Sequence, residues 1–288
     1  MNTHSLWPAV LGTTESAIRS GALERIPTRM EFVEEGGTRF QVHLVQQLER
    51  KRRAKIAQRQ TGANPFLPYE EALFVADVSA THLCLLNKFN VMDHHLLIVT
   101  REFEDQETLL TAPDFEAMWL CMGEFDGLAF YNSGEVAGAS QAHKHLQLVP
   151  LPLGGGRERT PIEGLLTEAF FQGSLSQGSL GTVPAFRFAH SLARVDHLNS
   201  TAPSEAARAT EAIYREMLEG WVESGTPHPY NLLVTRNWML FVPRSEEMHG
   251  SISVNALGFA GSLLARDEGE LEAIRRRGPL GILEDVGE

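Results

Sequence analysis

Apolar runs of strand length, separated by short polar turns, are the feature that most limits what this chain can fold into. Three of them, ALFVADVS, THLCLLNK and HHLLIVT, follow one another between Ala72 and Thr100, with the turn residues Asn90 and Asp93 before the last. Short connections join antiparallel strands, whereas parallel neighbours need long crossovers. Because helical patterns occur on both sides of these runs, the sequence predicts an α+β fold with a mainly antiparallel sheet and flanking helices.

The same reasoning predicts the other elements. Further strands are expected at 40–45, 127–134 and 143–152, together with a hairpin made by YNLLVT and WMLFVPRS that turns at Arg236-Asn237. Helices are expected over the first twenty residues, from Pro113 to about Gly123, over 205–223 and in the segment that ends at Arg277.

Charge argues against partners that are large polyanions. The chain has 25 Lys and Arg residues against 37 Asp and Glu residues, a net charge of −12, which disfavours binding to nucleic acid or to anionic membranes. One segment is an exception, because Thr38 to Arg59 contains seven basic residues and a single acidic one, Glu49. If the protein binds an anion, the cationic groups must be local.

Cysteine content and hydropathy indicate an intracellular protein. Cys84 and Cys121 are too few for a disulfide framework or a complete zinc site. The first residues lack the pattern of a signal peptide, and no run approaches the ~20 apolar residues of a membrane span. We therefore expect a soluble, reduced, cytoplasmic chain.

The segment most informative about chemistry is GASQAHKHLQLVP, from Gly138 to Pro150. In a strand, alternate side chains share a face, so His143, His145 and Gln147 are expected on one face, opposite the face of Lys144 and its apolar neighbours. Three polar side chains in a row are costly to bury without partners. This face is therefore expected to meet solvent or a ligand.

Three interpretations of this strand are open from the residues themselves. It could be a wet edge strand with incidental histidines, or half of a metal site whose third ligand comes from a distant histidine. It could also supply a nucleophilic histidine that attacks phosphorus, with the preceding glycine-rich loop offering N–H groups and Ser140 to phosphate oxygens. Candidates for the third metal ligand are His94, His95, His190 and His197.

The motif YNSGEVAGASQAHKHLQLVP resembles the His-x-His-x-Gln signature of the transferase branch of the histidine-triad superfamily, and specifically the diadenosine tetraphosphate phosphorylase (ATP adenylyltransferase) family. LLNKFNVMDHHLLIVTREFEDQ, YNLLVTRNWMLFVPRS and SVNALGFAGSLL resemble the same family in the expected order. The resemblance covers roughly Phe40 to Arg266 and implies a histidine-triad, uridylyltransferase-like fold.

The resemblance also implies a domain organisation. An N-terminal catalytic region, 1–180, would carry the motif strand, and a C-terminal region, 200–288, would complete the same fold. The intervening 153–204 is rich in Gly, Ser and Pro and weak in periodicity, which is typical of an insert or linker.

What the resemblance implies about function is phosphorolysis of diadenosine tetraphosphate to ATP and ADP. His145, the second motif histidine, would be the nucleophile and would carry an adenylyl intermediate that phosphate resolves. His143 would support the site by hydrogen bonding, and Gln147, where the hydrolase branch has histidine, would bind a phosphate oxygen. The substrate-binding residues implied by the match are Lys55, Asn87, Lys88, Asn132, Gly138, Ala139, Ser140, Gln141, Gln147, Asn255, Gly258 and Arg266.

Rival functions differ from this one in identifiable residues. Lys144 stands where the hexose-1-phosphate uridylyltransferases have proline, which weakens a sugar-nucleotide assignment. Two alternatives stay open: a related nucleotidyltransferase that acts on adenylylsulfate or a nucleoside diphosphate sugar, and a non-catalytic sensor of dinucleoside polyphosphates. Asp93-His94-His95 is reminiscent of metal-dependent phosphoesterases, but the preceding strands offer only Asp77 as a further carboxylate. No metal site or cofactor is expected, magnesium would enter as the counterion of the nucleotide, and the oligomeric state stays open.

Overall fold

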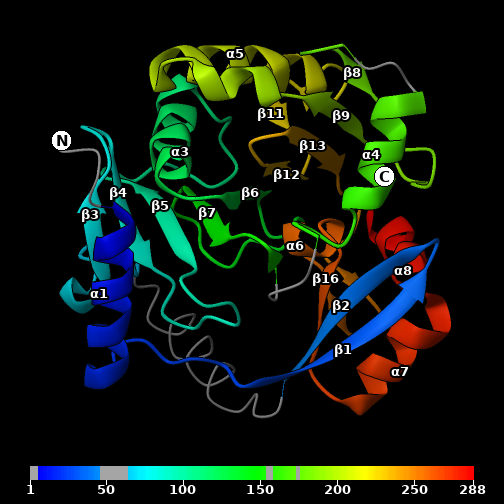
Figure 1. The fold of residues 1–288 in the computed structure, drawn as a ribbon, viewed down its shortest axis with the longest axis horizontal. Helices are drawn as coiled ribbons and strands as arrows, with labels where there is room; N and C mark the ends of the chain where they lie inside the picture. Colours follow the sequence, from blue (N-terminus) through cyan, green and yellow to red (C-terminus); the bar gives the residue numbers. More distant parts are fainter. Residues whose placement is uncertain (1–5, 46–63, 154–157, 173–175) are drawn as a thin grey trace.

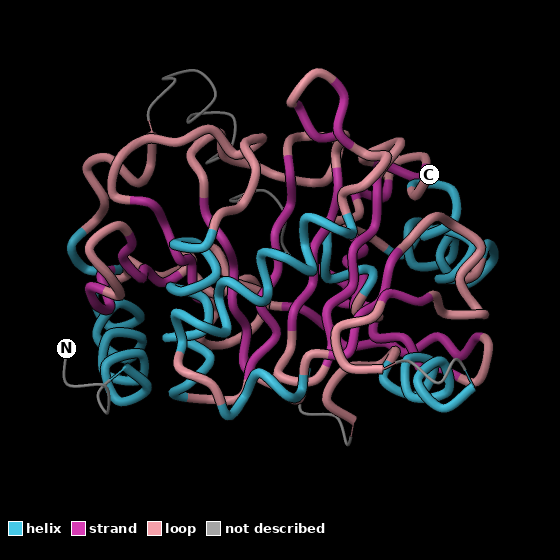
Figure 2. The backbone as a smooth tube through the Cα atoms, turned by 90° about the horizontal axis from the view of Figure 1, so that it is seen from above, coloured by secondary structure: helices cyan, strands magenta, loops and turns pink. Residues whose placement is uncertain are grey.

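A large antiparallel sheet organises the molecule. The computed structural model describes residues 6–45, 64–153, 158–172 and 176–288, and the α+β prediction is confirmed. Nine strands lie in the order β3-β4-β5-β7-β6-β12-β13-β9-β8, and every neighbouring pair is antiparallel (Figures 1 and 2). The strands are β3 (Phe74–Asp77), β4 (His82–Leu86), β5 (Leu96–Thr100), β6 (Gly127–Ser133), β7 (His145–Pro150), β8 (Leu180–Gly181), β9 (Ser191–Arg194), β12 (Tyr230–Val234) and β13 (Trp238–Pro243).

A smaller sheet lies beside it and was predicted only in part. It pairs β1 (Thr28–Glu35) with β2 (Thr38–Val45) antiparallel, and β2 with β16 (Ser262–Ala265) parallel (Figure 1). β2 was expected, but β1 was not, because TRMEFVEE is mostly polar and shows no fully buried position. Two short hairpins are β10 (Val222–Glu223) with β11 (Thr226–Pro227), and β14 (Met248–His249) with β15 (Ile252–Ser253).

Three helices pack one face of the large sheet: α1 (Leu6–Ser20), α3 (Ala112–Glu124) and α5 (Pro203–Met217). The sequence starts α3 where expected, with Pro113 in the first turn and the Asp114 carboxylate accepting the Thr111 N–H at 2.8 Å. Leu146 and Leu148 of β7 point into this core, as strand alternation predicts.

The opposite face of the sheet carries two separate apolar clusters. One is covered by the small sheet, α4 (Glu163–Gln172), α6 (Ala256–Phe259), α7 (Glu268–Arg277) and α8 (Pro279–Val286). The other joins Phe66 to alternate residues of β4 and β5. His145 and Gln147 lie on this face, on a strand between the two clusters.

The described residues between 153 and 204 contribute elements to the fold. β9 pairs with β13 within the large sheet, and α4 contributes Leu165 and Leu166 to the core, so the described parts of this segment are structural elements. A 3-10 helix, Asp196–Ser200, leads into α5, and another, Glu71–Leu73, precedes β3. β8 and β9 were not predicted because strands of two and four residues give no measurable period.

None of the helices in the described ranges is both long and apolar enough to cross a bilayer.

Candidate active site

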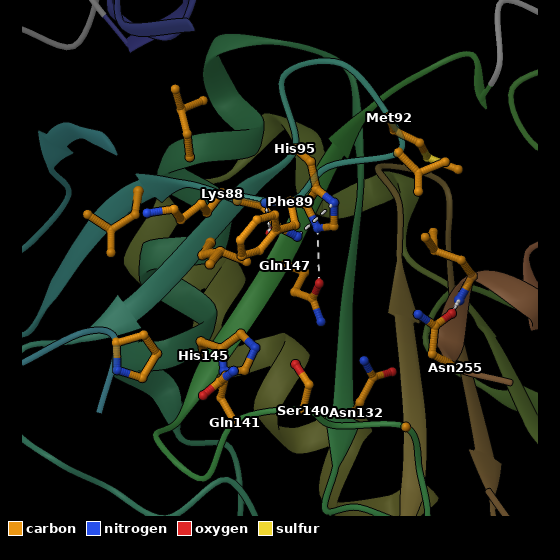
Figure 3. Close-up of a pocket in the computed structure, with 18 of the residues that line it drawn as sticks. Lys88, Phe89, Met92, His95, Asn132, Ser140, Gln141, His145, Gln147 and Asn255 are labelled. Carbon is orange, nitrogen blue, oxygen red and sulfur yellow. Dashed lines mark hydrogen bonds between the residues drawn. The ribbon is translucent and has the colours of Figure 1, made fainter. Parts of the chain in front are cut away.

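A cavity of about 800 Å³ opens on the face of β7 that carries His145 and Gln147 (Figure 3). Its walls come from segments far apart in the sequence: the 65–73 loop, the ends of β4 and β5, the 132–141 loop, and the small sheet with α6. Polar side chains converge on it from all of these walls. They include His43, Glu70, Asn87, Lys88, His95, Asn132, Ser140, Gln141, His145, Gln147, Glu247, Ser253, Asn255 and Ser262.

His145 is the first residue of β7, and its side chain is held in one tautomer. Its Nδ1 lies 2.8 Å from the carbonyl oxygen of His143, and because a carbonyl can only accept, Nδ1 carries the proton and donates. Nε2 then keeps its lone pair, and no described residue forms a hydrogen bond with it. Burial lowers the pKa of His145 to about 4, so the ring is neutral at neutral pH.

His143 lies just before β7, and both of its ring nitrogens are engaged. Nε2 donates to the carbonyl oxygen of Thr100 at 2.9 Å, which leaves Nδ1 as the acceptor of the Asn64 amide N–H at 2.9 Å. The side chain does not line the cavity, and its backbone carbonyl is what fixes His145.

These contacts decide between the interpretations left open by the sequence. β7 lies between β5 and β6, so the wet edge strand is wrong. A shared metal would need a free nitrogen on His143, and neither is free. Across the described residues, no three potential metal-ligating side chains of His, Cys, Asp or Glu cluster. The geometry favours a nucleophilic histidine.

Gln147 is oriented by a histidine that the sequence did not connect with it. His95 Nε2 lies 3.0 Å from Gln147 Oε1, and its Nδ1 lies 3.3 Å from Asn87 Nδ2 (Figure 3). Since Gln147 Oε1 can only accept, His95 donates to it. The amide nitrogen of Gln147 is thereby left as the end that can donate to a ligand in the cavity.

The loop before β7 approaches α6 closely. Gly138 has φ +88°, and a Cβ there would lie 2.9 Å from the Cβ of Asn255, so both conformation and space require glycine. Ser140 and Gln141 line the cavity, whereas Ala139 does not. The N–H of Ala139 donates a hydrogen bond to the carbonyl of Gly134 at 3.0 Å.

Two asparagines and a glycine of the predicted set lie on the cavity wall and also support the fold. Asn132 accepts hydrogen bonds from Asn231 at 2.9 Å and from the Ala256 N–H at 3.0 Å. Asn255 caps α6, because its side chain accepts a hydrogen bond from the Leu257 N–H at 3.1 Å. Gly258 leaves no room for a side chain, since a Cβ at this position would lie 2.8 Å from the side chain of Val254.

The predicted cations differ in where they lie. Lys88 is at the cavity rim, where its Nζ pairs with Glu70 at 2.6 Å and both side chains are exposed. Arg266 does not line the cavity, because its guanidinium is bound by Glu270 and, at 2.7 Å, by the carbonyl of Ser251. Lys55 lies outside the described residues, as does most of the basic segment.

Sequence reasoning missed the aromatic and histidine neighbours of the site. Phe66 packs its ring 5.3 Å from that of His145, but it comes from a proline-punctuated loop with no periodic signal. His95 could have been found from register: Leu97 pairs with Gln147, and residues two apart share a face. His43, from β2, is buried at the far wall, and burial lowers its pKa to about 4.

Comparison with known proteins agrees with this geometry. The model of the Ap4A phosphorylase N-terminal domain matches residues 1–168, and that of the ATP adenylyltransferase C-terminal domain matches residues 184–288. The chain belongs to the Ap4A phosphorylase family. The predicted boundaries of the regions 1–180 and 200–288 stay a prediction.

Relatives from Saccharomyces cerevisiae fit this assignment. Diadenosine 5',5'''-P1,P4-tetraphosphate phosphorylase 2 is 30% identical over 244 residues, which are 73% of this chain and 70% of the relative. Protein APA1 is 27% identical, over 88% of this chain and 84% of its own. The crystal structure of yeast Ap4A phosphorylase Apa2 in complex with Ap4A has the same fold, with a TM-score of 0.78 and 22% identity over 99% of this chain and 97% of that chain.

Proposed function

We propose that this protein cleaves Ap4A, diadenosine tetraphosphate, with inorganic phosphate to give ATP and ADP. Its family and one of its yeast relatives are named for this activity. The observation that carries the proposal is the state of His145: Nδ1 donates to a fixed carbonyl, and Nε2 keeps its lone pair on the wall of a cavity.

The reaction would proceed as two displacements at one phosphorus atom. In the first, His145 Nε2 attacks the α-phosphorus, a P–N bond forms, and the P–O bond to the departing ATP breaks. In the second, an oxygen of inorganic phosphate attacks the same phosphorus, the P–N bond breaks, and ADP leaves with the Nε2 lone pair restored. Two in-line transfers at one fixed group replace a direct encounter between two polyanions.

Neutral donors and a few cations would stabilise the charge on the phosphates. Gln147 can donate its amide N–H because His95 occupies its oxygen, and it adds no acidic proton. Ser140 and Gln141 of the 138–141 loop line the same cavity. Lys88 at the rim, and Lys55 by resemblance, would oppose the charge of the leaving ATP. Magnesium stays a prediction as the counterion of the nucleotide, and so does a cytoplasmic location.

Product analysis tests this function. Protein is incubated with Ap4A, with and without phosphate, and the nucleotides are separated. With phosphate we expect repeated turnover to ATP and ADP in equal amounts. Without phosphate we expect no ADP and at most one equivalent of ATP per protein. AMP with ATP, independent of phosphate, would show a hydrolase, and binding without turnover would show a sensor; either result contradicts the proposal.

The low pKa of His145 predicts an unusual pH profile for the first displacement. A ring with an ordinary histidine pKa of about 6.5 would be roughly nine-tenths protonated, and unable to attack, at pH 5.5. With a pKa lowered to about 4 by burial, the neutral form persists there. We expect the second-order rate constant for single-turnover ATP release without phosphate, measured with Ap4A below saturation, to change less than about twofold from pH 8 to 5.5, because it reports the free enzyme. A tenfold fall over that range would contradict the assignment.

A further inference from the structure

Gln106 lies between the two strands that carry the candidate active site, although neither the motif nor the resemblance singled it out. Its side chain is 1% exposed. The amide oxygen accepts the backbone N–H of His145 at 2.8 Å, and the amide nitrogen donates to the carbonyls of Asn132, at 2.9 Å, and His145, at 3.3 Å. Both hydrogens of the amide nitrogen and its oxygen are therefore engaged with backbone.

This side chain replaces a missing part of the sheet. The β6–β7 ladder runs from Gly127 opposite Pro150 to Phe130 opposite Gln147, and it stops there. Beyond that point β6 continues to Ser133 beside β12, while β7 begins at His145. At the point where β6 and β7 separate, the side-chain amide of Gln106 forms the hydrogen bonds that a neighbouring backbone would otherwise form with His145 and Asn132. It thereby fixes the backbone of His145 relative to Asn132.

The loop that carries Gln106 is itself held before any ligand binds. The backbone N–H of Gln106 donates to the carbonyl of Ala142 at 2.8 Å, and the backbone carbonyl of Gln106 accepts a hydrogen bond from the hydroxyl of Tyr131. Lys144 also holds this loop. Its backbone N–H donates to the carbonyl of Glu104 at 2.8 Å, and its Nζ donates to the carbonyl of Leu109 at 3.0 Å. Gln106 is thus a rigid support for the strand.

We propose that Gln106 is a positioning residue for the nucleophile, which acts through the backbone of His145 and does not touch substrate. It is not among the residues that line the cavity, while the nucleophile that it holds is. This inference rests on the proposed function, because it assigns Gln106 to the first displacement. A misplacement of about 1 Å at a reacting atom can cost about 100-fold in rate.

Two substitutions test the role. Gln106→Glu keeps the shape and an acceptor for the His145 N–H, but its carboxylate cannot donate to the two carbonyls. Gln106→Ala removes all three bonds. For the folded fraction of each variant we expect single-turnover ATP release at saturating Ap4A to fall about 10- to 100-fold, with KM for Ap4A changed less than about threefold.

A buried glutamine elsewhere in the fold is the matched control. Gln41 is 5% exposed and donates to the carbonyl of Leu153 at 2.9 Å, and it does not line the cavity. Gln41→Ala should lose stability without losing rate per folded molecule. A rate within twofold of wild type in both Gln106 variants would overturn the inference, as would a loss matched by Gln41→Ala or one confined to KM. Failure of the wild type to release ATP would instead count against the proposed function.

Discussion

Replacing His145 with alanine is expected to lower the rate of ATP release from Ap4A by at least ~10³-fold, as removal of other covalent nucleophiles does. Without the imidazole there is no atom to form the P–N bond, and the cavity can only bind the substrate. Ap4A affinity should therefore change much less than the rate. The measurement is single-turnover release of ATP by folded variant and wild type.

His190→Ala is a suitable control for this experiment. His190 is a partly buried histidine that is likewise held by hydrogen bonds, to the Val183 N–H at 2.7 Å and the Phe188 carbonyl at 2.8 Å, but it does not line the cavity. The His190→Ala substitution should lower the stability of the protein somewhat and leave the rate of ATP release near that of wild type. Near-normal turnover by His145→Ala would rule out an intermediate on this residue.

Lys144→Met is expected to destabilise the protein by about 3–5 kcal/mol, because it leaves a buried carboxylate without its cation. Lys144 is 1% exposed, and its Nζ lies 3.0 Å from both Asp114 and Glu104. Burial alone would raise the pKa of Asp114, but hydrogen bonds from His82 and Thr111 and the charge of Lys144 outweigh it and lower that pKa to about 2. Asp114 is therefore ionised and needs the ammonium group.

Denaturant unfolding measures this loss. Arg19→Met removes an exposed ion pair with Glu15 and should cost less than about 1 kcal/mol. The double variant Lys144→Met/Asp114→Asn should recover part of the loss, because the unpaired charge is gone. If Lys144→Met were no more destabilising than Arg19→Met, the buried network would contribute nothing to stability.

The sequence predicted most of the large sheet because its strands alternate cleanly or are uniformly apolar. β4, β5, β12 and β13 are each buried along their full length, and such runs leave a clear signal. β1 was missed because it is mostly polar and has no fully buried position, and the short strands within 153–204 were not predicted because they have no measurable period. Pairing with neighbours far along the chain, which defines these elements, is not visible in local periodicity.

The candidate site was predictable where chemistry is local and not where it depends on register. The strand pattern brought His145 and Gln147 to one face correctly, and both line the cavity. His143 was expected beside them, but its side chain turns to Thr100 and Asn64. His95 and Gln106 lie 52 and 39 residues before their partners, Gln147 and His145, so local periodicity does not connect them.

Trapping the intermediate on His145 tests the central claim most directly. Wild-type protein is mixed with Ap4A in the absence of phosphate, and both the nucleotides and the protein mass are followed. We predict one equivalent of ATP per protein and a protein heavier by one adenylyl group, mapped to the peptide that contains His145; added phosphate then releases ADP and restores the original mass. ATP release without adduct formation, or an adduct on another residue, would contradict the account.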